Sequence, residues 1–143
     1  MKKILLVEDS DADALQFQRA IDQLDIANPV HRVHTAEDAL AYLDDSIQTA
    51  AIAAPPASIL MIDLLLPGMS GLELLEKVAG RRGLDQTLRI VLSNINAVKT
   101  IQRAYTLGAR SFLIKPVQPA DLHELAETYP GYWAFAPQLT HAL

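Results

Sequence analysis

The sequence predicts an α/β fold, a doubly wound parallel sheet of five strands with helices on both faces. Short apolar runs alternate along the chain with segments whose apolar residues recur at helical spacing. Two of the runs, ILLV at 4–7 and SILMI at 58–62, are almost wholly apolar, as expected for strands that are covered on both faces. Sheets of this type commonly have the strand order 2-1-3-4-5, which we adopt as the prediction.

The first half of the chain is expected to hold three strands, at 4–7, 30–33 and 58–62. A helix is expected over 12–24, where Ser10 with Asp13 is typical of a capping box. Its inward face comprises Ala14, Leu15, Phe17, Ile21 and Leu24. A second helix is expected over 36–43. The following stretch, 44–58, is longer than most connections and ends in two prolines, so we expect a surface excursion there.

The second half is expected to continue the alternation. Strands are predicted at 90–92 and 112–114, and helices at 71–78, 97–107 and 119–128. Gly80 and Gly108 end the first two of these helices, and Pro119 opens the last one.

Composition limits the function. The 143 residues carry a net charge of −5, which argues against a broad nucleic-acid-binding surface, and there is no cysteine for disulfide or thiol chemistry. The opening MKKILLV resembles an export signal, but Glu8 and Asp9 end its apolar run too early, and no run is long enough for a membrane span. We therefore expect a cytoplasmic protein with one domain over 1–128 and an aromatic tail over 129–143.

Acidic side chains follow two buried strands. Glu8 and Asp9 come after the first strand and Asp63 ends the third, and the order 2-1-3-4-5 makes these strands neighbours. Three carboxylates at one sheet edge favour a hard divalent cation, Mg²⁺. Ser93 and Lys115 follow the fourth and fifth strands, so the same edge is expected to bind an anion through a metal.

These motifs resemble, in order and spacing, the CheY-like receiver domain of two-component response regulators: LLVEDS, DLLLPGMSGLELL, IVLSN and GARSFLIKP. The resemblance covers about residues 1–128. It implies a (βα)₅ flavodoxin-like fold and a signalling protein that catalyses its own phosphorylation and dephosphorylation. A sensor histidine kinase would supply the phosphoryl group to Asp63. Glu8, Asp9, Asp63 and the backbone carbonyl of Leu65 would hold Mg²⁺.

The resemblance also implies roles around the acceptor. Ser93 would bond the phosphoryl group in the active state, and Lys115 would pair with the phosphoryl oxygens. The peptide bond between Lys115 and Pro116 would be cis, which aims the ammonium inward. Phe112 would be the switch aromatic. Leu65 and Ile95 occupy the two rim positions that control attack by water. Both are apolar, which predicts a long-lived acyl phosphate, while Asn94 stands where a small residue is usual.

Other functions remain to be weighed. A flavin binder of the same fold needs a phosphate cradle after the first strand, where EDSDAD would instead repel phosphate. The alternative that stays open is a degenerate receiver, which would act as an unphosphorylated protein-interaction module.

The tail holds four of the eight aromatic residues of the chain: Tyr129, Tyr132, Trp133 and Phe135. Such a cluster predicts a protein interface, for which we favour a homodimer, although folding back over the last helix would also cover these side chains. The aromatic tail and the long loop before the third strand resemble those of the single-domain regulators that are paired with phytochrome kinases, so the expected kinase is a phytochrome.

Overall fold

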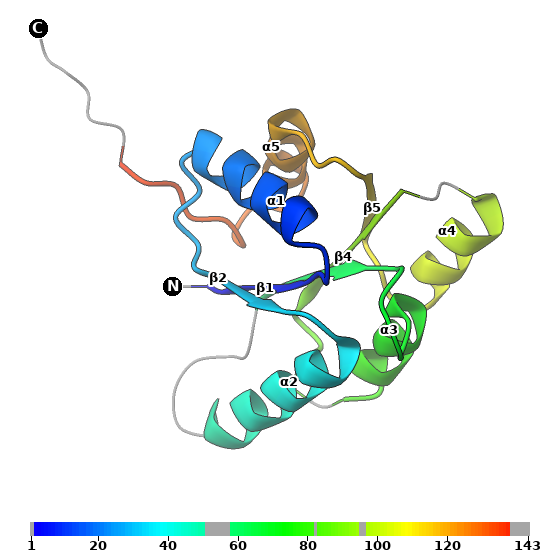
Figure 1. Cartoon of the computed structure of the whole chain (residues 1–143). Helices are drawn as coiled ribbons and strands as arrows, with labels where there is room; N and C mark the ends of the chain where they lie inside the picture. Colours follow the sequence, from blue (N-terminus) through cyan, green and yellow to red (C-terminus); the bar gives the residue numbers. More distant parts are fainter. Residues whose placement is uncertain (1, 51–57, 82, 95–96, 138–143) are drawn as a thin grey trace, which may run out of the picture.

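Five parallel strands form a sheet in the order β2-β1-β3-β4-β5 in the computed structural model (Figure 1). The model describes residues 2–50, 58–81, 83–94 and 97–137. The strands are β1 (Ile4–Val7), β2 (Val30–Val33), β3 (Ile59–Asp63), β4 (Leu88–Ser93) and β5 (Ser111–Ile114). The predicted fold class and strand order are confirmed.

Helices cover both faces of this sheet (Figure 1). On one face lie α1 (Asp11–Gln23) and α5 (Pro119–Thr128), and on the other lie α2 (Ala36–Ala50), α3 (Gly71–Ala79) and α4 (Val98–Thr106). Among the described residues, no helix has both the length and the apolar character that a bilayer span requires.

Each strand contributes to two cores because successive side chains point to opposite faces. In β1, Leu5 and Val7 pack with α2 and α3, whereas Ile4 and Leu6 pack with α1 and α5. All four are buried, as expected for parallel strands with helices on both sides.

Two expectations about the helices are wrong. Leu15 is 52% exposed, because α1 meets the sheet through Ala14, Phe17 and Ile21, and the next position along a helix is turned by about 100°. Helix α2 continues to Ala50, whereas we expected the helix to end at residue 43. The segment 44–50 contains neither glycine nor proline, so nothing in it ends the helix, and Pro55 and Pro56 lie outside the described residues.

The strand register brings four predicted site residues to one edge, at the carboxyl ends of the strands: Glu8, Asp63, Ser93 and Lys115. Glu8 follows the last residue of β1, and Asp63 and Ser93 are the last residues of β3 and β4. Lys115 follows β5, and its backbone N–H donates to the carbonyl of Ser93 at 3.0 Å. We call this the carboxyl edge.

The opposite edge, which we call the amino edge, is closed by the described part of the tail, 129–137. After α5 the chain turns back toward α1 and β2 (Figure 1). The Ala27 N–H donates to the carbonyl of Ala134, and the Ala136 N–H donates to that of Asp25, each at 2.7 Å. These bonds join the tail in antiparallel fashion to the loop between α1 and β2.

Asn28 is the buried side chain that ties these segments together. Its Nδ2 donates to the carbonyls of Lys2 and Tyr132, both at 2.9 Å, and its Oδ1 accepts from the Ala134 N–H at 2.7 Å. One amide group therefore connects the start of β1, the start of β2 and the tail.

The tail aromatics pack on their own domain, which is the second arrangement that the sequence left open. Tyr129, Tyr132 and Trp133 are partly buried against the core beneath α1 and α5. The Tyr129 and Tyr132 hydroxyls donate to the carbonyls of Arg110 and Gln86, each at 2.9 Å. Of the four aromatics, Phe135 is left 52% exposed. The protein interface predicted for these four residues stays a prediction.

Candidate functional site

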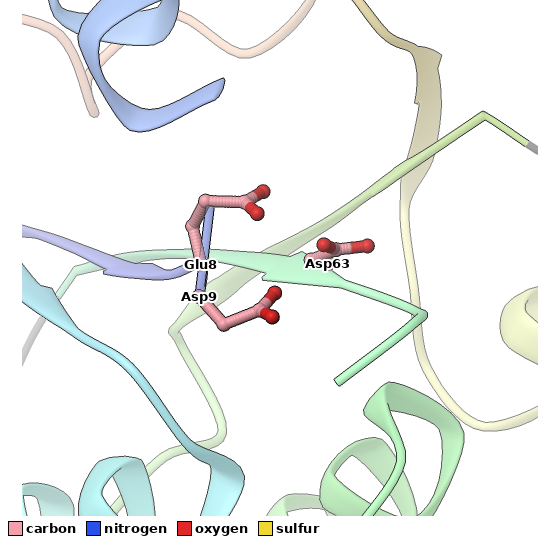
Figure 2. Close-up of side chains that lie close together, drawn as sticks. All are labelled: Glu8, Asp9 and Asp63. Atoms are coloured by element: carbon pink, nitrogen blue, oxygen red, sulfur yellow. The ribbon is translucent and has the colours of Figure 1, made fainter. Parts of the chain in front are cut away.

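Three carboxylates converge at the carboxyl edge. One oxygen from each of Glu8, Asp9 and Asp63 lies within 4.8 Å of the others, and Figure 2 shows the side chains projecting from the ends of β1 and β3. Glu8 and Asp63 are buried, whereas Asp9 is exposed. Oxygen ligands with one side open to water suit Mg²⁺, so the donor set fits the predicted cation.

Lys115 is the cation among these acids. Its Nζ lies 2.6 Å from Glu8 Oε2, 2.7 Å from Asp63 Oδ2 and 3.0 Å from Asp13 Oδ2, and the side chain is 7% exposed. The Lys115–Pro116 peptide bond is cis, as the resemblance implied. The ammonium compensates part of the negative charge that the strand ends bring together.

Burial and pairing shift the pKa values of two members of this cluster, Glu8 and Lys115. Burial raises the pKa of Glu8 to about 7, although hydrogen bonds from Lys115 and from the Ser10 N–H favour its charged form. Burial acts to lower the pKa of Lys115, but its hydrogen bonds to Asp63, Glu8 and Asp13 outweigh that effect and raise it. Lys115 thus stays charged, and its single positive charge does not balance the negative charge of the acids around it.

Asp63 is held firmly by its neighbours. Its Oδ1 accepts the Leu65 N–H at 3.0 Å, while Oδ2 pairs with Lys115. Gly71, the first residue of α3, packs directly on the same backbone: a Cβ there would lie 2.4 Å from the Asp63 carbonyl oxygen. Only glycine permits this approach, which fixes the start of α3 against the end of β3.

The turn after Asp63 is anchored by a residue that the sequence did not single out. Glu37 Oε1, in the first turn of α2, accepts the Met69 N–H at 3.0 Å. Gly68 in this turn has φ +73°, a conformation that favours glycine. Glu37 reads as an ordinary acid at a helix start, so no sequence signal distinguished it.

Arg32 was not predicted as part of the site either, because no sequence signal distinguished it. Its Nε donates to the Glu8 carbonyl at 2.9 Å, and its Nη1 pairs with Asp11 at 2.8 Å. A cation on β2 therefore supports the backbone that carries Glu8.

The capping box predicted at Ser10 is only half formed. Ser10 Oγ accepts the Asp13 N–H at 3.2 Å, as predicted. The reciprocal bond is absent, because the Ser10 N–H donates to Glu8 Oε1 at 3.1 Å. The Asp13 carboxylate contacts Lys115 instead, and this makes it a site residue that the sequence analysis had assigned to the helix cap.

The remaining predicted residues differ in how far they are buried. Ser93 is fully buried at the end of β4, and Phe112 is partly buried against the core on the α2–α4 side. Leu65 is 57% exposed and Asn94 is exposed. Ile95 lies outside the described residues. The Leu65 carbonyl remains a predicted ligand.

Residues 4–127 match the family model described as the response regulator receiver domain. The chain belongs to this family. The rice two-component response regulator ORR6 (Oryza sativa subsp. japonica) is 31% identical over 122 residues, which cover 85% of this chain and 67% of that protein. As a receiver domain, the chain is a signalling protein of the two-component type.

Solved structures confirm the receiver fold. The bacteriophytochrome response regulator AtBRR is 27% identical with a TM-score of 0.80, and the match covers 96% of this chain and 99% of that one. The Mn²⁺-bound form of response regulator Rcp1 is 25% identical with a TM-score of 0.71, covering 90% of this receiver and 91% of Rcp1. Receiver domains bind Mg²⁺ or Mn²⁺ at an acidic pocket, and this receiver carries an acidic cluster.

Proposed function

We propose that this receiver accepts a phosphoryl group from a sensor histidine kinase on Asp63 and thereby changes its protein contacts. The observation that carries the proposal is the surroundings of Asp63. The buried carboxylate has the Lys115 ammonium at 2.7 Å and the acids Glu8 and Asp9 within 4.8 Å. A nucleophile, a cation for the phosphoryl oxygens and a metal-binding acid pair are the parts that the reaction needs.

In the transfer step, a carboxylate oxygen of Asp63 attacks the phosphorus of a phosphohistidine. The phosphorus–nitrogen bond breaks, its electron pair stays on the imidazole nitrogen, and that nitrogen takes up a proton. An acyl phosphate is left on Asp63. In hydrolysis, a water oxygen attacks the phosphorus, the bond to Asp63 breaks, and inorganic phosphate leaves the regenerated carboxylate.

Lys115 stabilises the charge that gathers on the transferring group. Its Nζ already lies beside Asp63, so a small shift pairs it with a phosphoryl oxygen. Glu8, Asp9 and Asp63, with the Leu65 carbonyl, would hold Mg²⁺, which would neutralise further charge on the phosphoryl oxygens.

The proposed output is a rearrangement of β4 and β5. Ser93 would bond a phosphoryl oxygen, and Phe112 would rotate toward the space that Ser93 leaves. Supporting this, Ser93 and Phe112 belong to paired neighbouring strands, and the partly buried ring of Phe112 packs at the margin of a core.

The proposed kinase is a phytochrome. AtBRR is a bacteriophytochrome response regulator, and its match covers a larger part of this chain than the 4–127 span of the family model. The likeness therefore extends beyond the part common to all receivers.

Phosphotransfer profiling tests this proposal. Histidine kinases of the source organism, labelled on histidine, are mixed with the wild-type chain and with Asp63→Asn. We expect rapid loss of label from a phytochrome kinase to the wild type and none to the variant. Absence of transfer from every kinase would favour the degenerate receiver instead.

A homodimer is the second part of the proposal, and it is supported by the exposed ring of Phe135 beside the packed part of the tail. Light scattering should show a dimer that Phe135→Ser weakens. A monomer at every concentration would contradict it.

A further inference from the structure

Three carboxylates share the Lys115 ammonium. Its Nζ donates hydrogen bonds to Asp63 and Asp13 and forms a close ion pair with Glu8. The side chains of Glu8 and Asp63 are 2% and 5% exposed, whereas that of Asp13 is 37% exposed. Asp13 is thus the partner that water replaces at least cost.

We propose that Asp13 is a positioning residue that restrains Lys115 in the resting site and slows phosphorylation of Asp63. The inference rests on the proposed function, because it concerns the rate of that reaction. Neither the acidic pair after β1 nor the acceptor strand includes Asp13, which belongs to the first turn of α1.

Competition for Lys115 is the first reason. A phosphoryl group arriving at Asp63 needs hydrogen bonds from the ammonium, and each bond held by a carboxylate has to be surrendered or shared. Asp13 accepts one of these hydrogen bonds, at 3.0 Å. An uncharged side chain of the same shape would release it more readily, since hydrogen bonds between charged groups are the stronger ones.

Charge is the second reason. The phosphodonor is an anion, and it approaches a cluster in which the carboxylates outnumber the single ammonium. Asp13 adds negative charge within direct reach of Lys115 without belonging to the acids grouped for the metal. Removing that charge lowers the repulsion that the donor meets.

A purely structural explanation makes a different prediction. Acids in the first turn of a helix are stabilised by its dipole, and Asp11 and Asp13 both occupy that turn of α1. Asp11 pairs with Arg32, its side chain is 90% exposed, and it has no contact with Lys115. If helix capping were the whole role of Asp13, the two residues would be interchangeable in their effect on the reaction.

The test compares initial rates of phosphorylation by acetyl phosphate at saturating Mg²⁺, followed by intact mass. The proteins are the wild type, Asp13→Asn, Asp13→Ala, Asp13→Glu and Asp11→Asn, each with its melting temperature. We expect Asp13→Asn and Asp13→Ala to react about tenfold faster than the wild type. Asp13→Glu should restore the wild-type rate, and Asp11→Asn should stay within about twofold of it. A merely structural role could not raise the rate.

The possible failures are distinguishable. Wild-type rates in both Asp13→Asn and Asp13→Ala, or an equal acceleration in Asp11→Asn, would overturn the role of Asp13 and leave the proposed function standing. A wild type that takes up no phosphoryl group would overturn the proposed function and this inference together.

Discussion

The two edges of the sheet are built by different means. At the carboxyl edge, charged side chains from the ends of β1 and β3 and from the first turn of α1 meet around Lys115, which follows β5. At the amino edge, backbone bonds from Ala27 and Ala136 to the tail and loop, together with the amide of Asn28, close the fold.

This difference separates chemistry from stability. Burial raises the pKa of Glu8 to about 7, and the nearby charge of Asp63 adds to this effect, so keeping this carboxylate ionised at the carboxyl edge opposes folding. At the amino edge, the buried amide of Asn28 pairs with backbone groups of Lys2, Tyr132 and Ala134, so this edge can hold the domain together while the other edge reacts. Substitutions at one edge should therefore alter the reaction, and those at the other should alter stability.

The largest effect is expected from Lys115→Met. Phosphorylation by acetyl phosphate at saturating Mg²⁺ should slow about 100-fold, or about 2.7 kcal/mol of barrier, because no cation then pairs with the phosphoryl oxygens. Lys77→Met, which removes the same charge from the exposed side of α3, is the control and should react normally. Equal rates in the two variants would remove Lys115 from the reaction.

Asn28→Ala should have the opposite profile. Its loss leaves the Ala134 N–H and two carbonyls without their partner, so the free energy of unfolding, measured with urea, should fall by about 2 kcal/mol. Phosphorylation of the folded protein should not change. Asn94→Ala, at an exposed position of the other edge, should alter stability by less than about 0.5 kcal/mol. Comparable losses in both variants would contradict the role of the Asn28 hydrogen bonds in holding the tail.

The sequence predicted the charged residues of the carboxyl edge but not the contacts of the amino edge. Glu8, Asp63 and Lys115 could be predicted as site residues because each follows an apolar run directly, and the end of a strand determines where the next side chain lies. The tail contacts depend on backbone groups of Ala27 and Ala134, which have no signature in the residue type.

The other errors concern single side chains whose sequence neighbours suggested a different role from the one they have in the fold. Asp13 suits a capping box as well as an ion pair, and only the fold brings Lys115, 102 positions away, to its carboxylate. Asn28 before Pro29 reads as an ordinary turn residue, although it is buried. Leu15 fits an apolar helical face that proved narrower than the pattern suggested.

Asp9→Ala should weaken Mg²⁺ binding tenfold or more, about 1.4 kcal/mol, when titrated calorimetrically without a phosphodonor. Asp9 is the exposed member of the acid group and reaches the same point as Glu8 and Asp63. Asp22→Ala removes an exposed acid from the far end of α1 and should bind normally. Unchanged affinity in Asp9→Ala would exclude it as a ligand.

The smallest effect concerns the lifetime of the acyl phosphate. Leu65→Asn combined with Ile95→Glu should speed its decay about tenfold, about 1.4 kcal/mol, because polar side chains can orient the attacking water. Leu65 is exposed at the rim as this requires. Decay at the wild-type rate would direct attention to Asn94.

Intact-mass measurement after incubation with acetyl phosphate and Mg²⁺ tests the central claim most directly. The wild-type chain should gain the mass of one phosphoryl group, and Asp63→Asn, which keeps the size of the side chain but loses the nucleophilic carboxylate, should gain none. A variant that is labelled as fully as the wild type would show that Asp63 is not the acceptor.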